Sequence, residues 1–242
     1  MPDNNLTPAE IGAQKAAEVL ARRREARATC AAALAAHPNP LNFQIQLIHA
    51  AAAIAETTRT TAGFLVAVGD SWFDYPIQDV LTVLEDNYGY SVQSAAHAGD
   101  AIESMAYTGG QLDKHARCID KVKAHGGNPK AILLSGGGDD IAGDEFGMLL
   151  NSSASPIHGW NDEVLDGVIN QRIATAYRTM LHAIMQYCEQ DLGRIPPILI
   201  HGYDYPVPDG RGFLGGWGPC RGRGSSPASR KSSTRISRLP PR

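Results

Sequence analysis

Long apolar runs are missing from this sequence of 242 residues, since none approaches the roughly 20 residues that a membrane-spanning helix needs. The first ten residues, Met1 to Glu10, also lack the basic flank and apolar stretch of an export signal. The four cysteines lie far apart and form no C-x-x-C pair, which argues against a zinc ribbon or a redox dithiol. These absences predict a cytoplasmic protein with reduced thiols and no membrane span.

Acidic residues are absent from the segment 219–242, which holds seven basic side chains. The rest of the chain has 15 basic against 25 acidic residues, and so lacks the positive surface that nucleic-acid binding requires. We therefore expect no nucleic-acid partner. The segment is rich in Gly, Ser, Pro and Arg without apolar periodicity, which predicts a basic disordered tail. A shifted reading frame is the other explanation for so abrupt a change.

The first 60 residues predict a helical extension. Thr7, Pro8 and Glu10 form a capping box with proline at the first helical position, and an alanine-rich helix should follow. The sequence HPNP at 37–40 interrupts this helix, because a residue before proline avoids helical dihedrals. The next segment mixes alternating and helical spacing, and we favour a second helix there. We expect residues 1–60 to pack on the following domain or to mediate self-association.

Residues 61–218 predict one α/β domain, in which apolar strands alternate with segments long enough to form crossover helices. The predicted strands are Phe64–Val68, Tyr90–Ala95, Ala131–Ser135 and Ile198–Tyr203. This alternation indicates a parallel sheet covered by helices on both faces.

The clearest helix signal begins at Asn161, a favourable N-cap that is followed by two acidic residues in the first turn. Apolar residues then recur every three or four positions, at Ile169, Ile173, Tyr177, Met180, Ile184 and Tyr187. We expect this stripe to face the sheet as part of the core.

Glycines and polar residues follow three of the predicted strands. Ligands of open parallel sheets sit beyond the carboxyl ends of the strands, so these segments are the candidate site. The segments are Gly69-Asp70-Ser71-Trp72, His97-Ala98-Gly99-Asp100 and Gly136-Gly137-Gly138-Asp139-Asp140.

The ordered set of motifs resembles the SGNH, or GDSL-type, serine hydrolase family, over roughly residues 63–218. The resemblance implies a flavodoxin-like, three-layer fold and hydrolysis of acyl, lipid or carbohydrate esters without a cofactor. It implies that Ser71 is the nucleophile, and that the backbone N–H groups of Ser71 and Gly99 bind the oxyanion. The residues that support these motifs are Gly69, Asp70, Gly137 and Asp140.

The sequence departs from the family pattern in two places. Asp139 stands where the family has an asparagine that donates to the oxyanion, whereas an ionised carboxylate only accepts. The family's D-x-x-H block, which supplies the histidine base, is absent from the sequence. A serine without a base is a poor nucleophile, so the resemblance implies an impaired hydrolase whose C-terminal part is incomplete. His201, at the end of the last predicted strand, is a candidate substitute base or substrate contact.

Two other classes of function stay open: a noncatalytic module that binds an acyl or carbohydrate ligand at the same place, and an association module. Other catalytic patterns fail. Ser135 lacks the preceding glycine of G-x-S-x-G, and Ile141 replaces the third glycine of a dinucleotide fingerprint. No metal site is expected, because calcium-loop spacing is missing from the acids Asp139, Asp140, Asp144 and Glu145.

Overall fold

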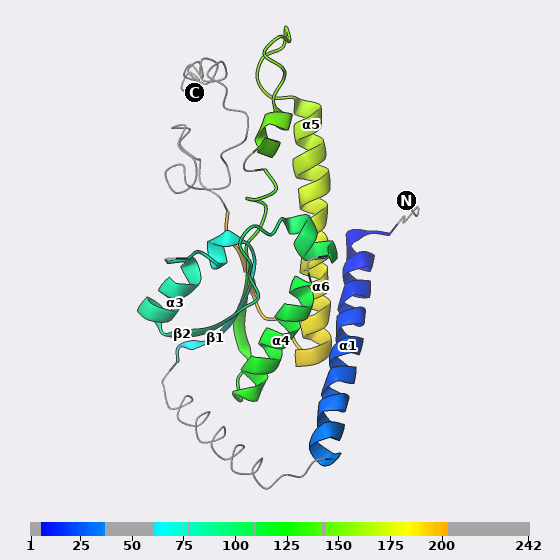
Figure 1. The fold of residues 1–242 in the computed structure, drawn as a ribbon, viewed down its shortest axis with the longest axis vertical. Coiled ribbons are helices and arrows are strands. Elements are labelled where there is room, and N and C mark those ends of the chain that lie inside the picture. Colours follow the sequence, from blue (N-terminus) through cyan, green and yellow to red (C-terminus); the bar gives the residue numbers. More distant parts are fainter. Residues whose placement is uncertain (1–5, 37–60, 77, 109, 142–143, 203–242) are drawn as a thin grey trace. The chain divides into compact units, whose positions relative to one another are not determined.

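The structure is a computed structural model that describes residues 6–36, 61–76, 78–108, 110–141 and 144–202 (Figure 1). The candidate second helix before residue 61 and the predicted tail at 219–242 lie outside the described residues. The chain divides into two compact units, of which the first comprises Met1–Asp140 and Asp166–His201 and the second Ile141–Leu165 and Gly202–Arg242. The sheet and the candidate site belong to the first unit.

Four parallel strands form the sheet, in the order β2-β1-β3-β4. Their bounds are β1 (Gly63–Val68), β2 (Tyr90–Ser94), β3 (Pro129–Leu134) and β4 (Ile198–Ile200). Each strand falls where the apolar runs of the sequence predict one, but β4 ends at Ile200 instead of continuing as predicted, and Tyr203 lies outside the described residues. The prediction of an α/β domain with a parallel sheet is therefore confirmed.

The sheet buries a different core on each face, because successive strand side chains point to opposite sides. Val66 and Val68 of β1 share a buried cluster with side chains of two helices, α4 (Gln111–Ala124) and α6 (Ala174–Leu192). Leu65 and Ala67 share another with Leu81 of the helix α3 (Val80–Tyr88). Figure 1 shows α3 on one side of the sheet and α4 and α6 on the other.

The N-terminal helix α1 (Pro8–Ala36) packs against α6. Its predicted capping box is present: the Thr7 N–H donates to the Glu10 carboxylate at 2.7 Å, and the Glu10 N–H donates to Thr7 Oγ1 at 3.3 Å. A Cβ atom on Gly12 would lie 2.7 Å from the Cβ of His182 in α6, and Ala16 one turn later is fully buried. Small residues therefore allow the close approach of these two helices.

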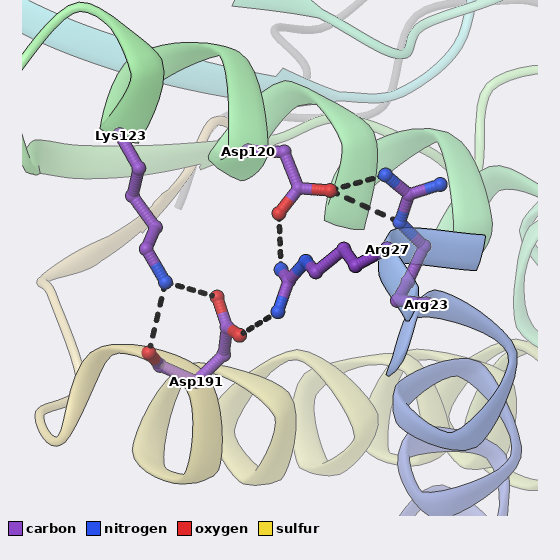
Figure 2. Close-up of polar contacts among 5 residues, drawn as sticks. All are labelled: Arg23, Arg27, Asp120, Lys123 and Asp191. Atoms are coloured by element: carbon purple, nitrogen blue, oxygen red, sulfur yellow. Dashed lines mark hydrogen bonds and ion pairs between the residues drawn. The ribbon is translucent and has the colours of Figure 1, made fainter. Parts of the chain in front are cut away.

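Charged side chains join α1 to α4 and α6, as Figure 2 shows. The carboxylate of Asp120 in α4 pairs with Arg23 and Arg27 of α1. Asp191 of α6 accepts from Arg27 and from Lys123 of α4, each at 3.1 Å. Although burial acts to raise it, these hydrogen bonds hold the pKa of Asp191 below its ordinary value. Arg27 thus ties the three helices together.

We expect Asp120→Asn to lower the free energy of unfolding by about 1–3 kcal/mol, because two guanidinium groups lose a charged acceptor that is only partly exposed. Asp113→Asn is the matched control. Its partner is Arg22, and because the side chains of this pair are 53% and 31% exposed for Arg22 and Asp113, its loss should cost less than about 1 kcal/mol. Urea unfolding of both variants measures the difference, and equal losses would contradict the stabilising role given to the three-helix network.

His115 of α4 lies in the core with its ring centroid 6.1 Å from that of Tyr187. Within the part of the chain that the structure describes, neither ring nitrogen has a hydrogen-bond partner. Burial lowers the pKa of His115 to about 4, so the imidazole is neutral in the folded protein at neutral pH.

The free energy of unfolding should therefore fall as the pH drops from about 6.5 towards 4, because the unfolded chain binds a proton at His115 before the folded chain does. The shift corresponds to a loss of up to about 3 kcal/mol. His115→Phe should remove this part of the acid sensitivity, whereas the same change at the exposed His158 should not. Urea titrations at neutral and acid pH measure the free energy of unfolding of both variants. If both keep the native pH dependence, His115 is not the group that causes this acid sensitivity.

The helix predicted after Asn161 begins as expected but is not continuous. Asn161 Oδ1 accepts the Val164 N–H at 3.2 Å, and α5 (Asp162–Asp166) follows. A π-helical segment, η4 (Gly167–Ile173), then precedes α6. Because a π turn holds an extra residue, apolar residues within it do not stay on the face that a regular α-helix would give them. Ile169 is accordingly 38% exposed. The prediction that Ile169 covers the sheet was wrong, while Met180, Ile184 and Tyr187 are buried as predicted.

Three cysteines, Cys30, Cys118 and Cys188, are free thiols, and Cys220 lies outside the described residues. Among the described helices, none combines the length and the apolar character that a membrane crossing requires.

Candidate active site

The register of the sheet sets the ends of three strands at one level. Val68 of β1 is paired with Leu134 of β3, and Leu134 with Ile200 of β4. The residues that follow these three, Gly69, Ser135 and His201, therefore begin neighbouring loops. The loop after β2 joins them, since the His97 N–H donates to the Gly69 carbonyl at 2.9 Å. All of the predicted site segments thus leave the same edge of the sheet.

Neighbouring side chains leave no space for a Cβ atom at Gly69. A Cβ atom there would lie 2.7 Å from the Cβ of Ser135 and 2.9 Å from the ring of Phe73. Such distances are too short for any side chain, so Gly69 allows the first and third strand ends to come together.

Ser71 is the first residue of a short 3-10 turn, η1 (Ser71–Phe73). Asp70 caps this turn, because its Oδ1 atom accepts the Trp72 N–H at 3.1 Å. Asp70 is 1% exposed, whereas Ser71 is half-buried and Trp72 is 50% exposed. The turn therefore holds the aspartate inside and leaves the serine within reach of solvent. Among the described residues, no hydrogen-bond partner is found for the Ser71 hydroxyl.

Gly99 and Asp139 lie near each other across the loops after β2 and β3, since the Gly99 N–H is among the groups that influence the pKa of the Asp139 carboxyl, and it acts to lower that pKa. Asp139 Oδ2 is buried, and no described residue bonds to it. The structure thus brings together two of the residues that the sequence predicts at the oxyanion.

Burial raises the pKa of the Asp139 carboxyl above its ordinary value, and neighbouring negative charges add to the effect. These charges are on Asp70, Asp140 and Asp100, while the Gly99 N–H acts in the opposite direction. The position beside Asp70 places Asp139 near the turn that carries Ser71. A carboxyl group in this setting gains a proton more readily than one in water.

Asp140 and Gly137 shape the loop after β3. The Asp140 carboxylate accepts the Ile102 N–H at 2.8 Å, which ties this loop to the segment after β2. Burial raises the pKa of Asp140, against the effect of that hydrogen bond. Gly137 has a φ of 93°, a conformation that glycine adopts without the cost of a Cβ atom. Both residues therefore support the position of Asp139.

Gln111 was not found by reasoning from the sequence. It begins α4 and is fully buried, and its Nε2 atom donates to the Gly69 carbonyl at 3.0 Å and to the Asp100 carboxylate. This amide bridges the loops after β1 and β2. A single glutamine at the start of a helix belongs to no sequence motif that would predict this role.

Ser135 and His201 form a second feature of this edge. His201 Nε2 lies 2.7 Å from Ser135 Oγ, and the Ser135 hydroxyl donates to Asp70 Oδ1 at 2.6 Å. The His201 ring is also 5.7 Å from that of Trp72 and 5.6 Å from that of Phe73, between centroids. The structure therefore places His201 beside the turn of Ser71 and joins it to Ser135. Ser135 is found from the strand register, which places it level with Gly69 and His201. The search for a G-x-S-x-G motif in the sequence did not select it.

In the described part of the chain, no three His, Cys, Asp or Glu side chains gather in a way that could hold a metal ion. Of the four acids considered above for a cation, the Asp144 and Glu145 side chains lie outside that part.

Comparison with known proteins identifies no family, since no protein-family model matches the chain and no curated protein matches its sequence.

Proposed function

We propose that this chain hydrolyses small-molecule esters through Ser71, on a flavodoxin-like fold of the SGNH type. The observation that carries the proposal is that Gly99 and the buried Asp139 carboxyl lie near each other at the carboxyl ends of a parallel sheet, close to Asp70, which caps the turn that begins with Ser71. Parallel sheets bind ligands at this edge. The three residues match the nucleophile and oxyanion positions that the resemblance implies.

The chemistry begins when Ser71 Oγ attacks the ester carbonyl carbon and its proton passes to a base. The carbonyl oxygen becomes an oxyanion, for which the N–H groups of Ser71 and Gly99 are the donors. The carbon–oxygen bond to the alcohol then breaks, and the alcohol leaves with a proton. Water attacks the acyl-serine in the same way and releases the acid. An ionised Asp139 opposes this sequence, because its negative charge lies near the Gly99 N–H and repels the oxyanion. We therefore expect slow turnover.

The surroundings of Ser71 favour an ester with an apolar group. Trp72 directly follows the nucleophile and is 50% exposed, so its ring offers a flat apolar contact next to the reacting atom. Acyl, lipid and carbohydrate esters all remain within this class.

A noncatalytic binding module is the second candidate, and the carboxylate of Asp139 near Gly99 favours it, because an ionised carboxylate cannot donate to an oxyanion and repels it. Turnover of p-nitrophenyl acetate and p-nitrophenyl butyrate by the whole chain separates the two. Hydrolysis predicts saturable release of p-nitrophenol above the buffer rate. Saturable binding of the ester without release would instead support the binding module.

Self-association through residues 1–60 stays a prediction. The apolar residues Ala16, Val19 and Leu20 of α1 are already buried within the chain, so a second copy would have to use other residues of this segment. Light scattering of the whole chain measures its oligomeric state.

A further inference from the structure

Residues 97–100, which follow β2, form a tight four-residue turn that we call the Gly99 turn. The Asp100 N–H donates to the His97 carbonyl at 3.2 Å and closes it. Gly99 is its third residue and has a φ of 86°, a conformation that favours glycine at this position of a turn. The place of the Gly99 N–H therefore depends on how the whole turn is held.

This turn is bonded on both sides of Ser71, the first residue of η1. The His97 N–H donates to the carbonyl of Gly69, two residues before Ser71, at 2.9 Å. The Ala98 N–H donates to Oδ2 of Asp74, three residues after Ser71, also at 2.9 Å. The Asp74 N–H in turn donates to the Ser71 carbonyl at 3.4 Å. The loop that carries Ser71 is thus joined to the Gly99 turn at two points that bracket the serine.

Gln111 closes this arrangement from the far end of the turn. Its Nε2 atom donates one proton to the Gly69 carbonyl at 3.0 Å and the other to Oδ2 of Asp100. A carbonyl and a carboxylate only accept, so the nitrogen of the amide and not its oxygen must face them. Gln111 is fully buried, which keeps water from competing for these bonds.

The position of Gln111 in α4 does not by itself account for a polar residue. The N-cap of this helix is Gly110, which makes no side-chain cap, and both bonds of the Gln111 amide lead to loops outside the helix. The next residue, Leu112, and Ile119 two turns further on belong to the apolar core. An apolar side chain would therefore serve the packing of α4 as well as a glutamine does.

We infer that Gln111 is a positioning residue, which fixes the Gly99 turn against the loop that carries Ser71. The expected oxyanion donors, the N–H groups of Ser71 and Gly99, lie in the two segments that its amide joins. Donors that are held in place before the reaction need no reorganisation when the oxyanion forms, which lowers the barrier of that step. Without the amide, Asp100 loses its tie to Gly69, and the turn gains freedom at its far end. The inference rests on the proposed function.

Hydrogen exchange tests the positioning without a substrate. Gln111→Met keeps the length of the side chain and removes both donated protons, so in the ¹⁵N-labelled whole chain the amide protons of His97 and Asp100 should exchange with water about 10-fold faster or more. Thr179→Val, a change at another fully buried polar side chain, should leave both rates as they are in the native chain. Native rates in Gln111→Met would overturn the inference.

The native chain supplies a measurement that does not depend on how the variant folds. Both Nε2 protons of Gln111 should exchange slowly with water, because they are buried and each is donated to an acceptor. The loss of their signals in Gln111→Met assigns them. Fast exchange of either proton in the native chain would contradict the bonds on which the inference depends.

Kinetics with p-nitrophenyl acetate separate positioning from packing. Gln111→Met should lower kcat about 10- to 100-fold with little change in KM, because displaced donors affect the reaction step. Asp100→Leu removes the other end of the same bond, so adding it to Gln111→Met should cause little further loss. Additive losses, or a native kcat in Gln111→Met while Ser71→Ala is inactive, would overturn the inference. If the native chain releases no p-nitrophenol, the proposed function fails, and faster exchange in Gln111→Met would then show a role in the loops alone.

Discussion

Ser71→Ala is expected to lower the hydrolysis of p-nitrophenyl esters by about 1,000-fold or more, to the uncatalysed rate. The hydroxyl is the atom that forms the acyl intermediate, so an alanine removes the reaction path rather than slowing one step of it. The change should leave the fold intact, because Ser71 is half-buried, and its backbone and the capping Asp70 are unchanged.

The control for this variant is Ser91→Ala. Ser91 lies on β2, paired with Phe64 near the amino end of the sheet and away from the candidate site. Its removal should leave kcat and KM as they are. A residual activity in Ser71→Ala equal to that of Ser91→Ala would show that another group does the chemistry.

Asp139→Asn is expected to raise kcat by about 100-fold, the size of effect that one oxyanion donor has in other enzymes. The asparagine amide can donate where an ionised carboxylate can only accept, and the negative charge beside the oxyanion disappears. Asp86→Asn is the matched control, because it removes one negative charge at an exposed position on α3. An unchanged or lower rate in Asp139→Asn would place Asp139 outside the oxyanion site.

The advantage of the asparagine should also depend on pH. Burial, and then the charges of Asp70, Asp140 and Asp100, raise the pKa of Asp139, so its neutral form persists to a higher pH than that of an ordinary aspartate. A neutral carboxylic acid can donate a hydrogen bond, as the amide does. The ratio of the two rates should therefore be largest in alkaline solution and should shrink as the pH falls. A ratio that is constant with pH would mean that ionisation of Asp139 does not affect the reaction.

Much of the fold could be predicted from the sequence because it depends on local patterns. Short apolar runs bounded by glycine and polar residues marked all four strands, and the capping box at Thr7 and the N-cap at Asn161 marked helix starts. The packing face of α1 could not be predicted, because it is formed by small residues such as Gly12 and Ala16, which give little contrast with an alanine-rich background. The π-helical segment before α6 also has no sequence signal that we could identify.

Some residues of the candidate site could likewise be predicted from local sequence patterns, and others could not. Residues within the glycine-rich segments, such as Gly99 and Asp139, could be chosen because they directly follow strands. Gln111 and Ser135 could not, since their roles arise from the register between strands and from the placement of α4, which bring together residues far apart in the sequence. The surroundings of Asp139 were equally hidden. The substitution was visible in the sequence, but the burial of this carboxyl beside Asp70 and Asp140 is a property of the folded loops.

The most direct test of the central claim is to map the covalent adduct of a fluorophosphonate probe on the whole chain. These probes react with an activated serine hydroxyl and release fluoride, and mass spectrometry of the digested protein identifies the modified residue. We predict one adduct, on Ser71, that forms faster in Asp139→Asn and is absent from Ser71→Ala. Labelling of the native chain at a different serine, or equal labelling of the heat-unfolded chain, would contradict the account.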